Sequence, residues 1–200
     1  MCYVLNVRSG NQTFIEAARR EQLARCAVEV IAEAGVAKAS MARIAERARV
    51  SVGVISYHFG NRAGLIDAVV GEVARSAVEL MEPLIVGQST ATGGLRALIT
   101  SNLEFMRLHP DEIKALLDII RADEGVYAAQ GGKAVEDVQR VLRWGQRTGE
   151  FGDFDTLVMA TSIRAAIDAV PPMITSDLDL TAYGEQLADL FERATRKEGN

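Results

Sequence analysis

The chain has 200 residues, of which 48% are hydrophobic and 24% are charged, and its formal net charge is −5 at pH 7. This length is sufficient for one large domain or two small ones with a substantial hydrophobic core. No apolar run approaches the roughly 18 residues of a membrane-spanning helix, and the first residues lack the apolar stretch of a secretory signal, so we expect a cytoplasmic protein.

Cysteine and histidine are scarce. The two cysteines are Cys2 and Cys26, and Cys26 lies at a core position of a predicted helix, so we expect no structural disulfide and a reducing compartment. The two histidines, His58 and His109, are too far apart in the chain for a metal-binding motif. We therefore predict neither a metal nor a cofactor.

Charge is distributed unevenly along the chain. Nine Lys and Arg residues stand against five Asp and Glu residues through Arg62, whereas the remainder has thirteen against twenty-two. A basic end attached to an acidic body is expected when one end meets phosphate and the rest keeps the protein soluble. The net negative charge therefore does not exclude a nucleic-acid partner.

The first predicted helix has a clear start and a clear end. Thr13 and Glu16 form a T-x-x-E capping box, which predicts that the helix starts near Phe14. Gly35 is expected to end it. Between them one apolar stripe recurs at helical spacing, formed by Leu23, Ala27, Val30, Ile31 and Ala34.

Three more helices are predicted in quick succession. Ser40 is the expected N-cap of a two-turn helix, Ser51 of a helix that runs to about Phe59, and Asn61 of a longer helix that continues towards Pro83. The two short helices are joined by the tight turn "ARVS", which is typical of a helix-turn-helix.

The rest of the chain also shows helical patterns, after a loose stretch at residues 87–94. A second loop is predicted at 125–132, and the two prolines at 171 and 172 separate the last two helices. Helices are expected over residues 95–108, 111–121, about 135–145, 155–169 and 180–197. The predicted fold class is therefore all-α, with about nine helices.

The short helix from Ser51 has two different sides. Val52, Ile55 and Phe59 share the side expected to face the helical bundle, whereas Gly53, Val54 and Tyr57 lie on the other side.

In a helix-turn-helix the second helix enters the major groove, so this second side is predicted to face DNA. Gly53 would permit close approach to the duplex, and Tyr57 would reach a phosphate or a thymine methyl group. The helix N-terminus at Ser51 favours an anion.

The stretch from about Phe14 to Val70 resembles the DNA-binding domain of the TetR family of transcriptional regulators. The resemblance is carried by "AVEVIAEAG", "ASMARIAERARVS" and "GVISYHFGNRAGLI". The remainder is similar in architecture and in "GQRTGEFGDFD" at residues 145–155. The resemblance implies four parts: a flexible N-terminal tail (1–12), a helix-turn-helix domain (13–60), a linking helix (61–86), and an effector-binding and dimerisation domain (87–200).

The resemblance also implies which residues hold DNA. Arg62 stands where the family usually has a phosphate-binding lysine, and arginine keeps the charge. His58 has an equally acceptable alternative as a packed hinge residue between the third and fourth helices. The full DNA-binding prediction is Ser40, Arg43, Ser51, Val52, Gly53, Val54, Tyr57, His58 and Arg62.

Two residues depart from the family pattern. Arg49 replaces the glycine that usually ends the second helix, where the backbone often needs a positive φ and a side chain costs about 1 kcal/mol. Ser56 stands where many members carry a tyrosine, so one phosphate contact is expected to be missing or shifted to Tyr57.

The last two helices are predicted to form a dimer interface. The final helix has apolar residues at two positions per heptad, and the preceding helix is rich in small residues, which would suit a four-helix interface between two copies. The alternative is that these residues cover the core of their own subunit. The predicted interface residues are Leu157, Thr161, Arg164, Ala165, Leu180, Tyr183, Leu187, Leu190 and Ala194.

The central helices of this family surround a small-molecule pocket, and the resemblance implies one here. The alternative for every candidate is an ordinary core residue. Asp118, Asp123 and Glu124 would favour a cationic ligand, but a solvated acidic face explains them equally well. The candidates are Phe105, Met106, Leu117, Ile120, Tyr127, Trp144, Met159 and Ile163.

The predicted function is a ligand-responsive repressor that binds a pseudo-palindromic DNA operator as a homodimer, with an unknown small-molecule effector and no membrane partner. An activator or an effector-independent regulator of the same fold is the alternative. A helical interaction protein that does not bind DNA is more remote. Catalysis is not expected, because the sequence has no nucleophile elbow, phosphate-binding loop or metal-ligand spacing.

Overall fold

The computed structural model of the chain describes residues 14–175 and 177–197, apart from the side chains of residue 14 and residues 124–130. The predicted tail at 1–12 and the capping residue Thr13 lie outside this range. Within it the chain forms nine α-helices, two short 3₁₀ helices and an isolated bridge between Phe151 and Arg196, so the predicted all-α class is confirmed. No helix in the described part is long and apolar enough to cross a membrane.

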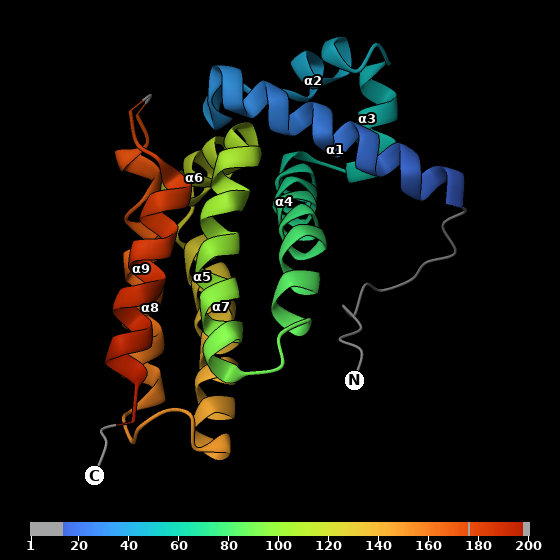
Figure 1. The fold of residues 1–200 in the computed structure, drawn as a ribbon. Helices are drawn as coiled ribbons and strands as arrows, with labels where there is room; N and C mark the ends of the chain where they lie inside the picture. Colours follow the sequence, from blue (N-terminus) through green and yellow to red (C-terminus); the bar gives the residue numbers. More distant parts are fainter. Residues whose placement is uncertain (1–13, 176, 198–200) are drawn as a thin grey trace. The chain divides into compact units, whose positions relative to one another are not determined.

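The chain divides into two compact units, and the boundary lies inside helix α4, between Glu72 and Val73. We call the first unit the head and the second the body. The head contains α1 (Phe14–Ala34), η1 (Val36–Lys38), α2 (Met41–Arg47), α3 (Val52–Phe59) and the first half of α4 (Arg62–Val86). Helix α2 packs against both α1 and α3 (Figure 1). The largest fully buried side chains of the head are Leu23, Ile31, Ile44, Ile55 and Leu65.

The ends of the head helices follow from local chemistry. The Ser40 hydroxyl oxygen accepts a hydrogen bond from the backbone N–H of Arg43 at 3.2 Å, and Asn61 Oδ1 accepts one from Gly64 at 3.0 Å. Gly35 ends α1 with a φ of 83°, a left-handed conformation that glycine adopts without steric cost. These predicted caps are confirmed. Ser51 occupies the N-cap position of α3, but its side chain makes no capping hydrogen bond.

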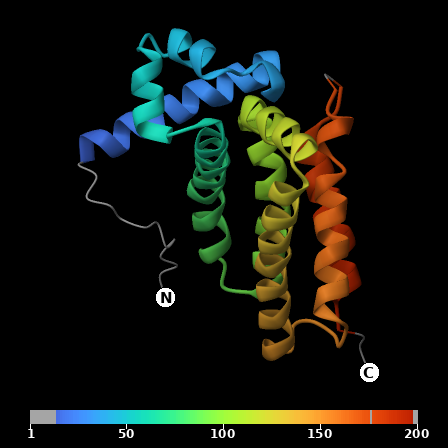
Figure 2. The ribbon, with the colours of Figure 1, turned by 180° about the vertical axis from the view of Figure 1, so that it is seen from behind.

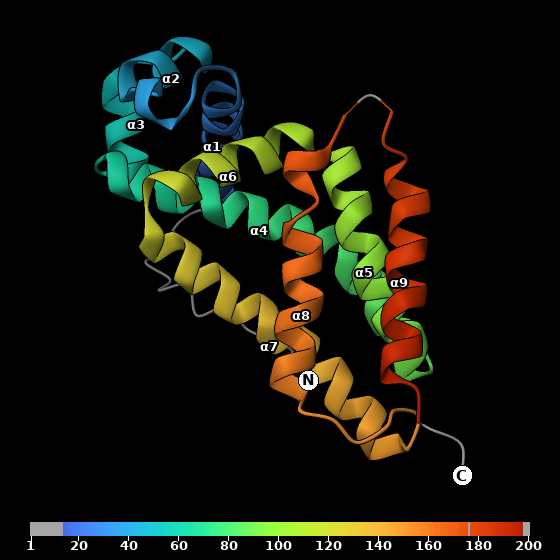
Figure 3. The same ribbon diagram turned by 90° about the vertical axis from the view of Figure 1, so that its left-hand side faces the viewer.

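The body contains α5 (Ala91–Leu108), α6 (Pro110–Ala122), α7 (Glu124–Thr148), α8 (Thr156–Asp168), η2 (Pro171–Met173) and α9 (Leu180–Thr195). Helix α5 packs against α7 and α9, and α7 packs against α8. Figures 1 and 2 show α5 with α7 in one layer and α8 with α9 in a second, and Figure 3 shows α8 and α9 from a perpendicular direction. The core between them includes Leu95, Ile99, Leu103, Leu142, Ile163 and Ile167.

Two predicted loops of the body were wrong in part. Helix α5 begins at Ala91, inside the stretch that was expected to be loose, because Thr90 and Glu150 cap its first turn. The stretch at 125–132 belongs to α7, and Asp123 alone separates α6 from α7. A glycine inside a helix costs about 1 kcal/mol relative to alanine, so the two glycines at 131 and 132 weaken this segment without ending the helix. Helix α4 likewise continues past Pro83 to Val86.

Candidate nucleic-acid interface

The turn between α2 and α3 has an unusual backbone. Arg49 has a φ of 54°, the only positive value found for a non-glycine residue in the described part of the chain. The turn is closed by hydrogen bonds from Arg49 N to Glu46 O at 3.1 Å and from Val50 N to Ala45 O at 2.9 Å. The predicted left-handed position is therefore confirmed, and it is occupied by an arginine instead of the expected glycine.

Helix α3 has a buried side and an exposed side, as the spacing predicted. Ile55 is fully buried and Phe59 is 6% exposed, whereas Tyr57 is 74% exposed. Val54 is half-buried. Val52 was expected to face the bundle, but it is 45% exposed, because it is the first residue of the helix and no neighbouring element covers it there. Its predicted place among the DNA-facing residues is compatible with this exposure.

Two glycines near α3 have different uses. A Cβ atom built on Gly64 would lie 2.2 Å from the carbonyl oxygen of Phe59, so the close approach of α3 and α4 requires a glycine there. A Cβ atom on Gly53 would meet only Ser51 Oγ, at an ordinary 3.6 Å. The fold therefore does not require glycine at 53. Because glycine has no Cβ atom, a partner molecule can approach the backbone of α3 more closely on this side.

The aromatic residues at the end of α3 are held by their neighbours. The Tyr57 hydroxyl donates a hydrogen bond to Glu16 Oε1 at 3.2 Å, and the Tyr57 ring meets the His58 ring edge-on at 5.2 Å. His58 is half-buried, and its Nδ1 is buried without a hydrogen-bond partner among the described residues. This arrangement favours the packed alternative for His58 over a DNA contact.

Several cations of the head are used inside the head itself. Arg47 joins α2 to α1 through Glu29, at 3.0 Å, and through Glu33. Arg25 pairs with Glu72 at 3.3 Å. The guanidinium of Arg20 lies 5.0 Å from the centre of the Phe59 ring, a cation–π distance. These contacts stabilise the packing of α1 against its neighbours.

Arg62, the predicted phosphate ligand, also makes internal contacts. Its Nη1 donates to the carbonyl oxygen of Ala39 at 2.7 Å, and its Nη2 donates to that of Val36. Both terminal nitrogens thus hold the short segment that leads into α2. Sequence reasoning missed this contact, since the partners are backbone atoms more than twenty positions away. A phosphate contact by Arg62 stays a prediction, and the structure gives the side chain a positioning role.

Three further cations of the head are exposed and make no such contact with the described residues. Lys38, Arg43 and Arg49 are exposed. Within the described ranges their side chains form no ion pair and no hydrogen bond. Arg49 lies in the turn just before α3, and Arg43 lies in the first turn of α2. The head therefore presents free guanidinium groups on α2 and in the turn that precedes α3.

The predicted dimer residues fall into two groups. Leu157 and Leu190 are 55% and 54% exposed, and Thr161, Ala165 and Ala194 are also exposed. Leu180 and Leu187 are 6% and 8% exposed and belong to the body's own core, which favours the alternative that they cover their own subunit. A two-per-heptad pattern identifies an apolar face of a helix but not which subunit covers it.

Three further observations complete the α8 and α9 surface. Tyr183 is half-buried and packs against the core. Arg164 donates to Asn102 Oδ1 at 3.1 Å and pairs with Asp168. Val158, which was not among the predicted interface residues, is 65% exposed. The apolar side chains of Leu157 and Val158 on α8 and of Leu190 on α9 therefore remain exposed in the described protomer.

The predicted effector residues are mostly packing residues. Met106 and Ile163 belong to the body core, and Phe105 is buried and stacks on His109 with ring centres 4.5 Å apart. Effector contacts by these three residues stay a prediction, and in this structure their side chains pack within the body. Leu117, Ile120, Trp144 and Met159 are half-buried. Tyr127 lies in α7, but its side chain is outside the described residues.

Two shallow hollows occur in the described structure, and no predicted effector residue lines either. One, of about 220 Å³, is lined by Leu84, Thr100, Ser101, Glu104, Thr181 and Glu185. The other, of about 250 Å³, is lined by Val30, Arg43, Glu46 and Arg47. Cys26 is also an unsuitable nucleophile, because burial raises the pKa of its thiol, opposite to the shift of a reactive thiolate.

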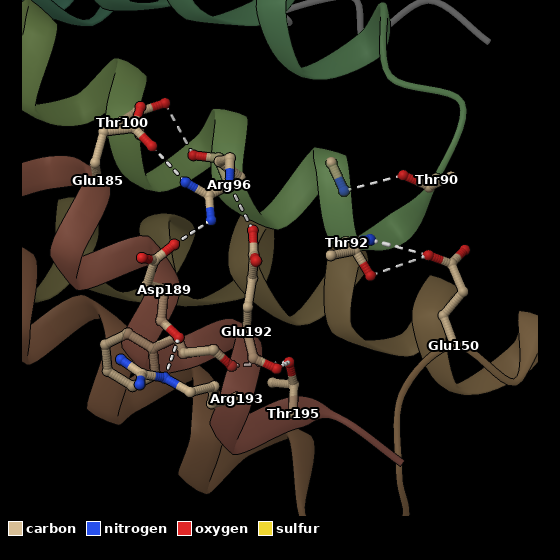
Figure 4. A network of polar contacts seen from close by, with 12 residues as sticks. Thr90, Thr92, Arg96, Thr100, Glu150, Glu185, Asp189, Glu192, Arg193 and Thr195 are labelled. Carbon is tan, nitrogen blue, oxygen red and sulfur yellow. Dashed lines mark hydrogen bonds and ion pairs between the residues drawn. The ribbon is translucent and has the colours of Figure 1, made fainter.

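The body contains a polar network that sequence reasoning missed (Figure 4). Arg96 on α5 pairs with three carboxylates of α9: Glu192 at 2.6 Å, Glu185 and Asp189. The hydrogen bonds that Arg96 donates to these carboxylates raise its pKa, and its guanidinium lowers the pKa of Asp189. The network joins α5 to α9.

At the start of α5, about one turn before Arg96, Glu150 acts as a cap (Figure 4). Its carboxylate accepts hydrogen bonds from the backbone N–H groups of Ala91 at 3.0 Å and Thr92 at 3.1 Å. These bonds favour the ionised form and lower the pKa of Glu150. The adjacent Phe151 packs on Gly145, where a Cβ atom would lie 2.1 Å from the ring. The segment predicted to link α7 and α8 thus also anchors the start of α5.

Comparison with known proteins supports the same assignment of the head. Residues 24–69 match the family model of bacterial regulatory proteins, tetR family. The chain is 30% identical over 102 residues to the HTH-type transcriptional regulator BetI of Cronobacter sakazakii, covering 50% of each chain. It is 33% identical over 106 residues to BetI of Escherichia coli, covering 52% of this chain and 54% of that one. The matched region is about half the length of these relatives.

Solved structures share the fold over nearly the whole chain. A regulatory protein in the tetR family from Rhodococcus RHA1 has a TM-score of 0.74 at 17% identity and covers 94% of this chain and 100% of its own. A protein from Saccharomonospora viridis in complex with choline has a TM-score of 0.74 at 19% identity, covering 91% and 100%. AibR in complex with isovaleryl coenzyme A and operator DNA has a TM-score of 0.70 at 19% identity, covering 90% and 100%.

Proposed function

Because the chain belongs to the TetR family of bacterial regulatory proteins, we propose that it is a ligand-responsive repressor that binds operator DNA as a homodimer. The observation that carries the proposal is the outer side of α3. It combines a 74% exposed Tyr57 with a glycine that the fold does not need, and the free Arg49 lies two residues before its N-cap. Acting on DNA, the protein would work in the cytoplasm.

In this proposal α3 enters the major groove. Val52, Gly53 and Val54 lie in its first turn, which is the part of a recognition helix that meets base edges. Tyr57 would exchange its 3.2 Å hydrogen bond to Glu16 for one to a phosphate oxygen. Arg43 and the Ser51 hydroxyl would add phosphate contacts, which fix the orientation of the helix without reading sequence.

The exposed apolar residues of α8 and α9 support the homodimer. Leu157, Val158 and Leu190 are each more than half exposed. Covering such residues is the main driving force for association between copies of one chain. A two-fold dimer would carry two recognition helices, which matches a pseudo-palindromic operator.

Ligand response is the least specific part of the proposal. Two proteins of the same fold hold choline and isovaleryl coenzyme A, so effectors of very different chemistry suit this architecture. The half-buried Leu117, Ile120, Trp144 and Met159 are our candidates for effector contacts. Release from DNA requires that the effector binds one conformation of the dimer more tightly than the other. A coupling free energy of about 1–3 kcal/mol changes the affinity for DNA about 5–150-fold.

An electrophoretic shift with the upstream region of the protein's own gene tests the proposal. We expect a defined complex that outcompetes an unrelated duplex and whose affinity falls steeply as salt rises, because phosphate contacts release counterions. Binding that is indifferent to sequence, or unaffected by salt, would contradict it. Sedimentation of the same sample should give the mass of a dimer of the 21.6 kDa chain.

A further inference from the structure

Arg49 stands in a conformation that suits glycine better. Its φ of 54° lies in the left-handed region, where an L-residue with a side chain is strained. The other described residues with positive φ are all glycines: Gly35, Gly60 and Gly149. Arg49 is thus the one described turn position at which the chain keeps a side chain despite this strain.

The fold gives no internal reason for keeping the arginine. Arg49 is exposed, and in the described part of the molecule its side chain makes no hydrogen bond or ion pair. Arg47, two positions earlier, is different, because it bridges to Glu29 and Glu33 on α1. The strain at Arg49 is therefore not offset by a contact within the head.

The position of Arg49 indicates what the side chain serves. It lies two residues before Ser51, where α3 begins, and so beside the surface that we propose meets DNA. Arg62, the residue that the family pattern assigns to phosphate, donates both terminal nitrogens to the carbonyl oxygens of Ala39 and Val36. The guanidinium at 49 makes no hydrogen bond or ion pair with the described residues, whereas the one at 62 already donates to two carbonyl oxygens.

We propose that Arg49 binds a phosphate group of the DNA backbone, and that the strained turn is kept for this contact. The inference rests on the DNA-binding function proposed above. The planar guanidinium can donate two parallel hydrogen bonds to one phosphate, which a glycine at this position could not replace. Such a contact would raise affinity for all duplexes rather than for one sequence.

Three variants separate the charge from the backbone strain. Arg49→Gly removes both, Arg49→Gln removes only the charge, and Arg49→Lys keeps both. We expect Arg49→Gly to raise Tm by about 2–4 °C and yet to weaken DNA binding roughly tenfold. Arg49→Gln should bind as weakly without the gain in Tm, and Arg49→Lys should bind within about threefold of the original protein.

The decisive readout is the salt dependence of binding, measured by fluorescence anisotropy on the upstream duplex and on an unrelated duplex. Loss of one phosphate contact per subunit should reduce the slope of log affinity against log salt by about 2 for a dimer, and should weaken both duplexes equally. Arg140→Gln on α7, an exposed arginine of the body, is the matched control for a lost charge.

Each outcome bears on a different statement. If Arg49→Gln keeps the original affinity and slope, the inference is overturned while the DNA-binding function stands. If the loss is confined to the upstream duplex, Arg49 contacts a base and the phosphate assignment is wrong. If the original protein binds neither duplex, the proposed function itself fails.

Discussion

The head and the body use arginine in opposite ways. In the body, Arg96 on α5 is surrounded by Glu185, Asp189 and Glu192 of α9 (Figure 4). In the head, Arg43 and Arg49 are exposed and form no side-chain contact with the described residues. The body thus satisfies its central arginine internally, whereas the head leaves two of its arginines available to a partner.

This difference shows that the contacts of an arginine side chain in the structure identify its role better than its place in a basic stretch of the sequence. The basic front of the chain predicted a phosphate-binding end, but the structure divides its arginines into two sets. Arg20, Arg25, Arg47 and Arg62 hold the head together. The remaining free arginines are the ones from which a salt-dependent interaction with DNA is expected.

The largest effect is expected at a glycine that the packing of the head requires. Gly64→Ala would place a methyl group 2.2 Å from the carbonyl oxygen of Phe59, and should lower the free energy of unfolding by about 3 kcal/mol. Urea unfolding measures this. Gly71→Ala, where a Cβ atom meets nothing within 4 Å, is the control and should be neutral or stabilising. Equal behaviour of the two variants would contradict the close approach of α3 and α4.

Gly53→Ala should stabilise the protein and weaken its binding to DNA. The fold accepts a Cβ atom at 3.6 Å from its nearest neighbour, so stability should rise by up to about 1 kcal/mol. DNA affinity should nevertheless fall about tenfold, because the added methyl group keeps α3 from the duplex. Anisotropy and thermal unfolding on the same preparation check both parts, and an unchanged affinity would show that Gly53 does not approach DNA.

Exchanging arginine for glutamine in each unit tests the comparison directly. Arg96→Gln leaves the partly buried Glu192 without its partner, and should lower stability by about 1–2 kcal/mol with no change in the salt slope of DNA binding. Arg43→Gln should leave the free energy of unfolding within about 0.5 kcal/mol of the original value and should reduce the salt slope of DNA binding. If Arg43→Gln lowers stability as much as Arg96→Gln does, the proposed division of roles is wrong.

The smallest effect is expected at the cap of α5. Hydrogen bonds lower the pKa of Glu150 in the folded state, so its contribution is present above the unfolded pKa and is lost as the pH falls through the folded value. Glu150→Gln should therefore lower stability at pH 7 by about 0.5–1 kcal/mol. Urea unfolding at pH 7 and near pH 3 should show the difference shrinking in acid. A difference that is constant across this range would exclude the charged cap.

Local signals predicted the head well. Ser40, Asn61 and Gly35 act on residues within a few positions of themselves, so their caps could be read from neighbouring residues. The left-handed turn at Arg49 was implied by the family resemblance instead. The division of α3 into a buried and an exposed side also followed from helical spacing.

The features that could not be predicted from the sequence are contacts between segments far apart in the chain. Glu150 caps a helix that begins 59 positions earlier, and Arg62 reaches carbonyl oxygens 23 and 26 positions away. Leu180 and Leu187 share a helix with the exposed Leu190, but tertiary packing covers only the first two within the protomer. Periodicity identifies apolar positions, and only the arrangement of the other helices shows what covers them.

A salt titration of DNA binding by the original protein and by Tyr57→Phe and Tyr57→Ala tests the central statement most directly, namely that the exposed side of α3 grips the duplex. With labelled upstream DNA, we expect affinity to drop modestly for the phenylalanine variant and at least tenfold for the alanine variant, while sedimentation shows the same oligomer throughout. Three indistinguishable titration curves would mean that α3 meets DNA with another face or not at all.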